Sequence, residues 1–500
     1  MNSTSQPPTS SHEIGKKVAG NAAWSYLSFG LSKALNLVTI SILAHLLTPE
    51  LFGVVALATL AIDYISILND FGLGAALVQR RENIDEASNI AFTFNLLIAI
   101  FLTFIIGLIS PYVALFFREP ALTPILRLLG LGFTINALGS IHKARLQRDL
   151  KFGKKLIPEL GSTLMKGGLS IGLAILGYGA WALVYGQLAG MSISALLLWI
   201  VVPWRPRLMI RSPISGPLFK YGFSVMMDRA FTVFADSFDY LLIGRFFNTA
   251  ALGIYTLAYR LPDLLILNTL SVLAAVFFPA FSSIQNQKDV LRKSFLSTTR
   301  YVQLLVTPLC LGIFVAADPI IRLIFGEQWV QSIPIMQVLS LYALTLSIGF
   351  HVGDIYKAVG RPDILLKIAI PIFVIRLTAL MIGSQFSLIG IAAGHLVAAL
   401  IEVVVRAIVT IRVINVSLRE ILAQLTAFIG GIVLLIFAVP VLYLTQDLAP
   451  WLRLVLVVMA GAVGYLGTIW FTDRGAILKG IGMLGILSKA PAEATKASEL

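Results

Sequence analysis

Apolar stretches of about 20 residues or more recur along almost the whole chain, with short polar segments between them. A bilayer core is about 30 Å thick, and a helix of about 20 apolar residues crosses it. The chain is 58% hydrophobic and 13% charged, whereas soluble domains are about 45–50% apolar and about 25% charged. We therefore predict an all-α polytopic membrane protein, because open strands leave backbone groups without partners in lipid.

About fourteen transmembrane helices fit this pattern, and glycine or proline breakers lie at many of the joints. The candidate spans run about 18–46, 52–78, 88–116, 121–141, 156–177, 180–202, 219–246, 252–280, 295–316, 330–356, 364–384, 387–411, 420–445 and 450–472. The polar segment before the first span lacks the features of a cleaved signal peptide, so we expect that span to be retained.

The basic residues provide a test of this count, because cytoplasmic loops of membrane proteins collect Lys and Arg. With the N-terminus in the cytoplasm, the even-numbered gaps and the two termini hold 25 of the 38 Lys and Arg residues, and the odd-numbered gaps hold four. A missed or invented helix would scramble this alternation downstream of it. The bias predicts a multi-pass inner-membrane protein with both termini in the cytoplasm.

An internal repeat organises the spans. Gly53 and Asp63 recur as Gly253 and Asp263 at a shift of 200 residues, and a later run recurs at a shift of 210. Spans one to six thus resemble spans seven to twelve, and an even number per repeat gives both halves the same orientation. Parallel repeats of this kind are a transporter architecture with the site between the halves. We predict two parallel six-helix lobes around a central cavity, plus two extra C-terminal helices.

The predicted domain organisation follows from these spans. It comprises a cytoplasmic N-terminal segment (1–17), an N-terminal six-helix lobe (18–203), a cytoplasmic inter-lobe linker (204–218), a C-terminal six-helix lobe (219–413), two additional transmembrane helices (414–473) and a cytoplasmic C-terminal tail (474–500).

Ionisable residues inside the spans are the candidate site, because a charge near the bilayer centre costs at least about 2.5–3.5 kcal/mol. Cations deep inside their spans suit a negatively charged substrate such as a diphosphate. The candidates for the substrate cavity are Lys33, Asn36, Arg229, Arg260 and Arg376. The candidates for coupling or charge balance are Asp228, Asp236, Asp239, Asp63 and Asp263.

Spacing supports part of this assignment. Asp228, Asp236 and Asp239 are spaced i, i+8 and i+11, which places them on one face of a continuous helix. Asn36 and Asp236 correspond at the 200-residue shift, so two symmetry-related helices carry polar groups at an equivalent level. A polar cavity between two lobes requires such an arrangement.

Structural roles compete with functional ones for several charges. Glu402 and Arg406, at i and i+4, can neutralise each other on one helix, and this interpretation is favoured. Arg260 and Asp263 can do the same at i and i+3, and both roles stay open for them. Lysines and arginines near the cytoplasmic interface can extend to it, as expected for Lys166, Arg300 and Lys367.

Several chemistries have no sequence support. There is no GxxxxGK[ST] phosphate loop, HExxH pair or paired CxxC site, so we expect no cofactor, no metal and no enzymatic activity. His351 and His395 lie inside spans, where a packed, hydrogen-bonded role is favoured over a proton relay. The buried carboxylates leave coupling to a proton or sodium gradient open. The basic loop from Lys143 to Lys155 suits lipid headgroups and topology better than nucleic acid.

Several stretches resemble a known family. AHLLTPELFGVV from Ala44, NDFGLGAALVQR from Asn69, GYGAWALVYGQ from Gly177, DSFDYLLIGRFF from Asp236 and LGIYTLAYRLP from Leu252 are similar to WzxC-like polysaccharide or O-antigen exporters of the oligosaccharide flippase family. The resemblance covers residues from about 15 to about 415. It implies the fold of the multidrug/oligosaccharidyl-lipid/polysaccharide transporter superfamily, with two lobes in a V around a central cavity.

The resemblance also implies a function. A flippase of this family moves a polyprenyl-diphosphate-linked oligosaccharide from the cytoplasmic to the periplasmic leaflet for O-antigen, capsule or exopolysaccharide assembly. Its expected partners are the lipid-linked oligosaccharide and membrane lipids, with a polysaccharide polymerase and glycosyltransferases as further candidates, and no nucleic acid. Two alternatives stay open: a drug/cation antiporter of the same superfamily, and a non-transporting membrane component of polysaccharide synthesis.

Overall fold

The protein is all-helical throughout the residues that its computed structural model describes, which are 30–80, 82–149, 151–210 and 215–475. Helices satisfy their backbone groups internally, which a chain this apolar needs when lipid surrounds it. The predicted all-α fold class is therefore confirmed, and no strand occurs in the described ranges.

Contacts divide the chain into two units, of which the first ends at Leu252 and the second begins at Gly253. The helices around residues 219–246 thus pack with the first unit, although the repeat analysis groups them with the second lobe. The lobe boundaries derived from the sequence stay a prediction.

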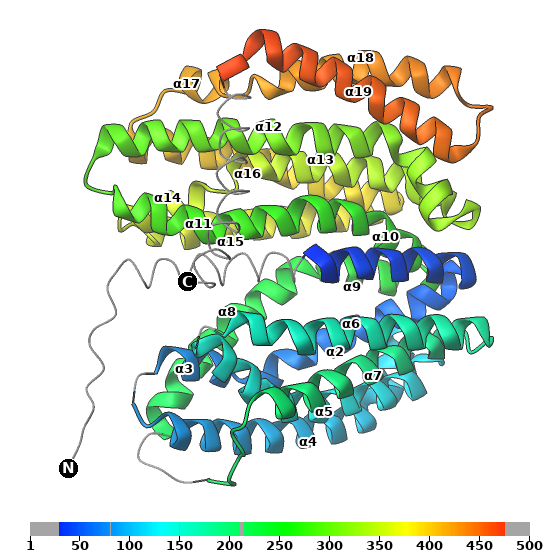
Figure 1. Cartoon of the computed structure of the whole chain (residues 1–500), viewed down its shortest axis with the longest axis vertical. Coiled ribbons are helices and arrows are strands. Elements are labelled where there is room, and N and C mark those ends of the chain that lie inside the picture. The colour runs from blue at the N-terminus through cyan, green and yellow to red at the C-terminus, as the bar shows by residue number, and fades with distance from the viewer. Residues whose placement is uncertain (1–29, 81, 150, 211–214, 476–500) are drawn as a thin grey trace, which may run out of the picture. The chain divides into compact units, whose positions relative to one another are not determined.

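The first unit is built from antiparallel long helices (Figure 1). After a described helix over Gly30–Leu46 come α2 (Pro49–Asp70), α3 (Leu73–Gln79), α4 (Ile84–Phe117), α5 (Leu122–Arg148), α6 (Phe152–Ile175), α7 (Ala180–Val201), α8 (Ser215–Asp236) and α9 (Phe238–Phe246).

The second unit begins within α10, at Gly253. Its elements are α10 (Thr249–Pro262), the π-helix η1 (Asp263–Leu267), α11 (Asn268–Ser283), α12 (Lys288–Ile320), the π-helix η2 (Ile321–Phe325), the 3₁₀-helix η3 (Glu327–Ser332), α13 (Ile333–Gly349), α14 (Val352–Ala358), α15 (Asp363–Ser384), α16 (Leu388–Ile414), α17 (Leu418–Ala423), α18 (Ala427–Leu444) and α19 (Pro450–Thr472).

Eleven helices in the described ranges are long and apolar enough to cross a membrane. Each of the fourteen predicted spans coincides with helix, but three of them fall outside this group. The predicted span 18–46 is described only from Gly30, and α6 and α8 are long but too polar. Helices are therefore found where the hydropathy predicted them, while the exact count of fourteen is not confirmed.

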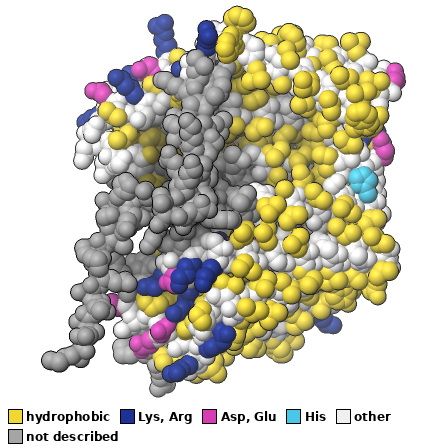
Figure 2. Space-filling model, in the orientation of Figure 1, with side chains coloured by type: hydrophobic (Ala, Val, Ile, Leu, Met, Phe, Trp, Pro, Cys, Tyr) yellow, Lys and Arg dark blue, Asp and Glu magenta, His cyan; other side chains and the backbone are white. Residues whose placement is uncertain are grey.

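Lipid-facing character is visible on the surface of each unit. Figure 2 shows hydrophobic side chains over most of the visible flank, with many Lys and Arg side chains gathered toward one end. Large side chains such as Phe104 and Leu115 are 64% and 74% exposed. Because no water reaches such a flank in a bilayer, exposed apolar side chains are the stable arrangement there.

The predicted span 52–78 is broken rather than continuous. Phe71 and Gly72 both adopt left-handed conformations, with φ of 43° and 65°, between α2 and α3. The break contacts α8 directly: a Cβ added to Gly222 would lie 2.4 Å from the carbonyl oxygen of Phe71. A side chain at either glycine would therefore separate the two backbones.

The two extra C-terminal helices are attached to α12 within the second unit (Figure 1). The hydroxyl of Tyr465 in α19 donates to the carbonyl of Leu304 at 2.8 Å, near the middle of α12. Ion pairs lie at both ends, joining Asp473 to Arg300 and Arg453 to Asp318. These contacts tie α18 and α19 to the rest of their unit.

Candidate functional site

The polar candidates of the first unit lie on four helices. Lys33 and Asn36 are half-buried in the helix Gly30–Leu46, and Asp63 is exposed on α2. Asp228, Arg229 and Asp236 are exposed on α8, whereas Asp239 on α9 is only 2% exposed.

The helix carrying the three aspartates is interrupted. Ser237, with φ of −114° and ψ of 10°, separates α8 from α9, so the i, i+8, i+11 spacing does not run along one continuous helix. The prediction of one shared face is therefore wrong. Asp228 and Asp236 remain exposed, while Asp239 is turned into the packed interior and accepts a hydrogen bond from the Tyr240 amide at 2.9 Å.

Two of the predicted residues face each other from α2 and α8, where the carboxylate of Asp63 lies within electrostatic range of the guanidinium of Arg229. Next to them, the Tyr64 hydroxyl lies within electrostatic range of Asp239. We call Asp63, Tyr64, Arg229 and Asp239 the α2–α8–α9 polar cluster. Pairing of opposite charges lowers the cost of keeping ions in an apolar helix bundle.

Tyr64 is a member that sequence reasoning missed. Its hydroxyl oxygen is buried, and no hydrogen-bond partner for it lies in the described ranges. Its ring packs against Phe234 of α8, with centroids 6.1 Å apart. The available signal was a tyrosine directly beside Asp63 in an apolar run. A buried donor without a partner is a costly group, which marks this position as one where a polar ligand group would be stabilised.

The second unit holds an ionic triad of two half-buried arginines around a buried glutamate. Glu402 of α16 pairs with Arg406 at 2.6 Å and with Arg376 of α15 at 3.4 Å. The expected neutralisation of Glu402 by Arg406 is thus present. Arg406 also donates to the carbonyl of Gly349 at 3.2 Å. One carboxylate between two guanidinium groups leaves the triad with an excess positive charge, and Arg376 belongs to this network.

Arg260 and Asp263 flank the transition from α10 to η1. No ion pair joins these two side chains, both of which the structure describes, and the buried Nε of Arg260 has no hydrogen-bond partner among the described residues. The Asp263 carbonyl accepts from Asn268 at 2.7 Å across the π-helical turn. Single π-turns inside α-helices occur frequently at functional sites.

The two intramembrane histidines are packed. His351 is fully buried, and its Nε2 lies 2.9 Å from the Thr299 hydroxyl. His395 is 4% exposed and its ring centroid lies 5.1 Å from that of Tyr342. These surroundings agree with the structural interpretation of both residues.

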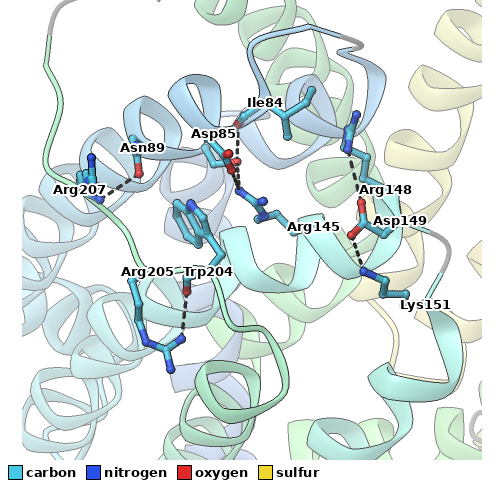
Figure 3. Close-up of polar contacts among 11 residues, drawn as sticks. Ile84, Asp85, Asn89, Arg145, Arg148, Asp149, Lys151, Trp204, Arg205 and Arg207 are labelled. Carbon is cyan, nitrogen blue, oxygen red and sulfur yellow. Dashed lines mark hydrogen bonds and ion pairs between the residues drawn. The ribbon is translucent and has the colours of Figure 1, made fainter. Parts of the chain in front are cut away.

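A separate polar network joins the predicted cytoplasmic ends of α4 and α5 (Figure 3). Arg145 pairs with Asp85 at 2.6 Å, and its guanidinium lies 5.0 Å from the ring centre of Trp204. Asp149 accepts from both Arg148, at 3.4 Å, and Lys151, at 2.9 Å. Because one carboxylate serves two cations, this end of the unit keeps positive charge for anionic headgroups.

The first part of the predicted inter-lobe linker is bound to this network. The amide of Arg207 donates to Asn89 and that of Met209 to Thr93, both at 2.9 Å (Figure 3 shows the first). The two donors are two residues apart in this segment, which is about 6.6 Å in an extended chain, and the two acceptors are four residues apart on α4, which is about 6 Å along a helix. The spacing of alternate amides in the segment therefore matches the spacing of successive turns of α4. The segment 202–210, which we call the strap, is therefore part of the first unit rather than a free connection.

A comparison with protein families gives a match over residues 42–334 to the family described as polysaccharide biosynthesis protein. This stretch is more than half of the chain. The chain belongs to this family. The matched region of this polysaccharide biosynthesis protein contains the whole α2–α8–α9 polar cluster and the strap. It ends before the ionic triad at Glu402.

Two curated relatives cover most of this polysaccharide biosynthesis protein. The chain is 27% identical over 358 residues to the teichuronic acid biosynthesis protein TuaB of Bacillus subtilis, covering 70% of this chain and 73% of that protein. It is 25% identical over 416 residues to the lipopolysaccharide biosynthesis protein WzxC of Escherichia coli, covering 82% and 85%. The WzxC-like resemblance drawn from the motifs is confirmed.

Solved structures identify the fold of this family member. The lipid II flippase MurJ, in an inward closed conformation, superposes with a TM-score of 0.74 at 16% identity, covering 91% of this chain and 99% of that chain. An inward-facing multidrug resistance MATE family transporter of the MOP superfamily gives a TM-score of 0.62 at 16% identity, covering 78% and 94%. The chain therefore shares the helical fold of these structures, whereas the arrangement of two lobes around a central cavity stays a prediction.

Proposed function

We propose that this polysaccharide biosynthesis protein is a flippase that moves a polyprenyl-diphosphate-linked oligosaccharide from the cytoplasmic to the periplasmic leaflet of a bacterial inner membrane. The family match over residues 42–334 is the observation that carries the proposal. The relatives TuaB and WzxC are named for teichuronic acid and lipopolysaccharide biosynthesis, and the fold neighbour MurJ is named a lipid II flippase.

The charge arrangement supports an anionic substrate. An oligosaccharide linked through a diphosphate brings negative charge into the membrane, and guanidinium groups bind phosphate oxygens with directed, charge-assisted hydrogen bonds. In this proposal Lys33, Asn36, Arg229, Arg260 and Arg376 contact the substrate as it passes. The aspartates at 63, 228, 236, 239 and 263 balance these charges or exchange a proton or sodium ion for coupling.

Transport in this proposal proceeds by alternating access of two lobes, as parallel repeats allow. Both termini lie in the cytoplasm, in agreement with the distribution of Lys and Arg in the sequence. The protein needs no cofactor and performs no covalent chemistry. A polysaccharide polymerase and glycosyltransferases, which would use or make the lipid-linked substrate, are the proposed partners.

Deletion of the gene, followed by measurement of lipid-linked glycan, tests this function. We expect lipid-linked oligosaccharide to accumulate on the cytoplasmic face and surface polysaccharide to disappear, with both restored by the wild-type gene. Charge-neutral variants at Lys33 or Arg229 should reduce export while the protein still inserts. Normal surface polysaccharide in the deletion strain would contradict the proposal.

The second candidate is a drug/cation antiporter, which the fold likeness to a MATE transporter and the exposed carboxylates of α8 favour. The same deletion strain separates the two functions. Unchanged surface glycan beside a lost resistance to cationic drugs would establish the antiporter and exclude the flippase.

A further inference from the structure

An open surface hollow of about 390 Å³ lies between α2, α4 and α9 of the first unit. Tyr64 of α2, Val113, Phe116 and Phe117 of α4, and Leu241 of α9 are among its lining residues. The volume falls within the range of about 300–1,000 Å³ that small-molecule sites occupy. The lining is almost entirely apolar, so the hollow suits a hydrocarbon chain and not a sugar.

A cation stands at the edge of the hollow. The guanidinium of Arg245, in the last turn of α9, lies 5.4 Å from the ring centre of Phe116. No carboxylate of the described residues pairs with Arg245, so its charge is available to an anion. A guanidinium stacked on a ring keeps its edge free for hydrogen bonds to phosphate oxygens.

Along the membrane normal, the cation and the apolar hollow follow one another in the same order as the anionic head and the hydrocarbon chain of a lipid. On the predicted topology, the Phe117 end of α4 faces the periplasm, and Arg245 lies near this end because it contacts Phe116. A lipid in the outer leaflet places its anionic head at this level and its chain toward the bilayer centre. The hollow continues inward as far as Tyr64, which belongs to the α2–α8–α9 polar cluster.

We propose that the hollow binds part of the polyprenyl chain of the translocated substrate, with the diphosphate on Arg245. The inference rests on the proposed flippase function and adds a product site in the periplasmic leaflet. A diphosphate carries more negative charge than the phosphodiester of a membrane phospholipid, and therefore complements an unpaired guanidinium better. Four aromatic rings along the lining, at Tyr64, Tyr112, Phe116 and Phe117, provide flat contacts for an unsaturated chain.

Photo-crosslinking of the full-length protein tests the site. The protein is placed in phosphatidylcholine nanodiscs with a benzophenone-tagged polyprenyl diphosphate, and the labelled peptides are identified by mass spectrometry. We expect labels on α2, α4 or α9 at the hollow. Unlabelled polyprenyl diphosphate should compete strongly and phosphatidylglycerol weakly. Equal competition by phosphatidylglycerol would show a general lipid crevice and overturn the proposal.

Matched variants locate the chain and the head separately. Val113→Trp fills the hollow, and its control, Leu108→Trp, adds the same ring at a 54% exposed position of α4 that does not line it. Arg245→Gln removes the cation, and its control, Arg118→Gln, removes a neighbouring exposed one. Labelling should fall about fivefold or more with V113W and R245Q, and change less than about twofold in the controls. Labelling of V113W equal to that of L108W would refute the site.

A flipping assay in proteoliposomes separates this inference from the proposed function. Wild-type protein that flips the lipid-linked oligosaccharide, together with a V113W variant that loses labelling and flips more slowly, supports both. Wild-type flipping beside undiminished V113W labelling refutes the hollow alone. Hollow-specific labelling without any flipping by wild-type protein refutes the flippase function and leaves a polyprenyl diphosphate site whose role is not translocation.

Discussion

Asp63 and Arg229 show how a nearby charge of opposite sign lowers the free-energy cost of an ionised side chain in an apolar helix bundle. Each would be costly alone in an apolar helix, but the structure brings them within electrostatic range of each other from α2 and α8. Both side chains are exposed on the first unit, so the strength of their coupling depends on what surrounds them. Water would screen the pair, whereas lipid would not.

A double-mutant cycle with Asp63→Asn and Arg229→Gln measures this coupling. If the pair faces a wet cavity, the coupling in the free energy of unfolding should be about 0.2–1 kcal/mol, as for exposed ion pairs in water. Unfolding of the four proteins by detergent titration gives the value. A coupling energy well above this range would place the pair in a dry environment and contradict the cavity.

Glu420 supplies a residue-scale pH prediction, because it lies in the short helix α17 and outside the helices of the structure that are long and apolar enough to cross a membrane. Hydrogen bonds from the backbone and side chain of Ser417 and from Arg292, at 2.5 Å, lower the pKa of Glu420 to about 2. A depressed pKa means that the folded state binds the proton less well than the unfolded state. Its stabilising effect is therefore present above the ordinary value of 4.5 and is lost as the pH falls toward 2.

Hydrogen exchange of the α17 amides provides the measurement. Protection attributable to Glu420 should be constant above pH 5 and decline through more acidic solutions. In Glu420→Gln the α17 amides should have, at every pH, the low protection that wild type reaches in acid, and this protection should not change with pH over this range. An identical acid profile for wild type and variant would show that the contact with Arg292 contributes nothing.

At the scale of elements, some of the helices that carry the polar groups depart from a simple apolar span. α6 and α8 are too polar to qualify as spans by composition, and α8 ends at Asp236, one residue before the break at Ser237. The segment after α2 breaks at Phe71 and Gly72 where it meets α8. Irregular backbone at membrane depth is tolerated where protein or a water-filled cavity surrounds it.

Gly222 gives an element-scale prediction, because its contact with the α2–α3 break leaves no room for a side chain. Gly222→Ala would place a Cβ 2.4 Å from the Phe71 carbonyl oxygen, and we expect it to destabilise the first unit by about 1–3 kcal/mol. Gly216→Ala on the same helix meets no atom within 4 Å and is the control. The control should be neutral or slightly stabilising, since alanine is the better helix former.

Thermal unfolding of both variants in detergent micelles decides this prediction. A lower unfolding temperature for G222A and an unchanged or higher one for G216A is the expected pattern. Equal unfolding temperatures for the two variants would mean that α8 can move away from the α2–α3 break without loss of stability.

On the scale of the whole molecule, two contact units follow one another along the chain, and α18 and α19 belong to the second. Ion pairs at both ends of these helices join them to α12, which indicates that they move with their unit. The family match and the relatives place the chain among polysaccharide biosynthesis proteins, and the solved structures share its helical fold.

Accessibility of introduced cysteines tests the orientation of this architecture. The native Cys310 is fully buried and can be replaced by serine to give a silent background. Glu119→Cys, after α4, should react with a membrane-impermeant maleimide in intact cells. Lys154→Cys, at the start of α6, should react only after permeabilisation, because the cation bias places it in the cytoplasm. Reaction of K154C in intact cells would show that the protein has the opposite orientation in the membrane to the predicted one.

The sequence alone determined the helical class, the position of a helix at every predicted span, the family and the need for charge pairing. Hydropathy and loop charge are local properties, so they can be summed along the chain without knowing which helices touch. The tertiary structure decided which charges act on one another, placing Arg229 within electrostatic range of Asp63 and Arg376 in the Glu402 triad. It also revealed Tyr64, the strap on α4 and the hollow at Val113. These features depend on side chains from distant helices meeting at ångström distances, which residue spacing on one helix does not encode.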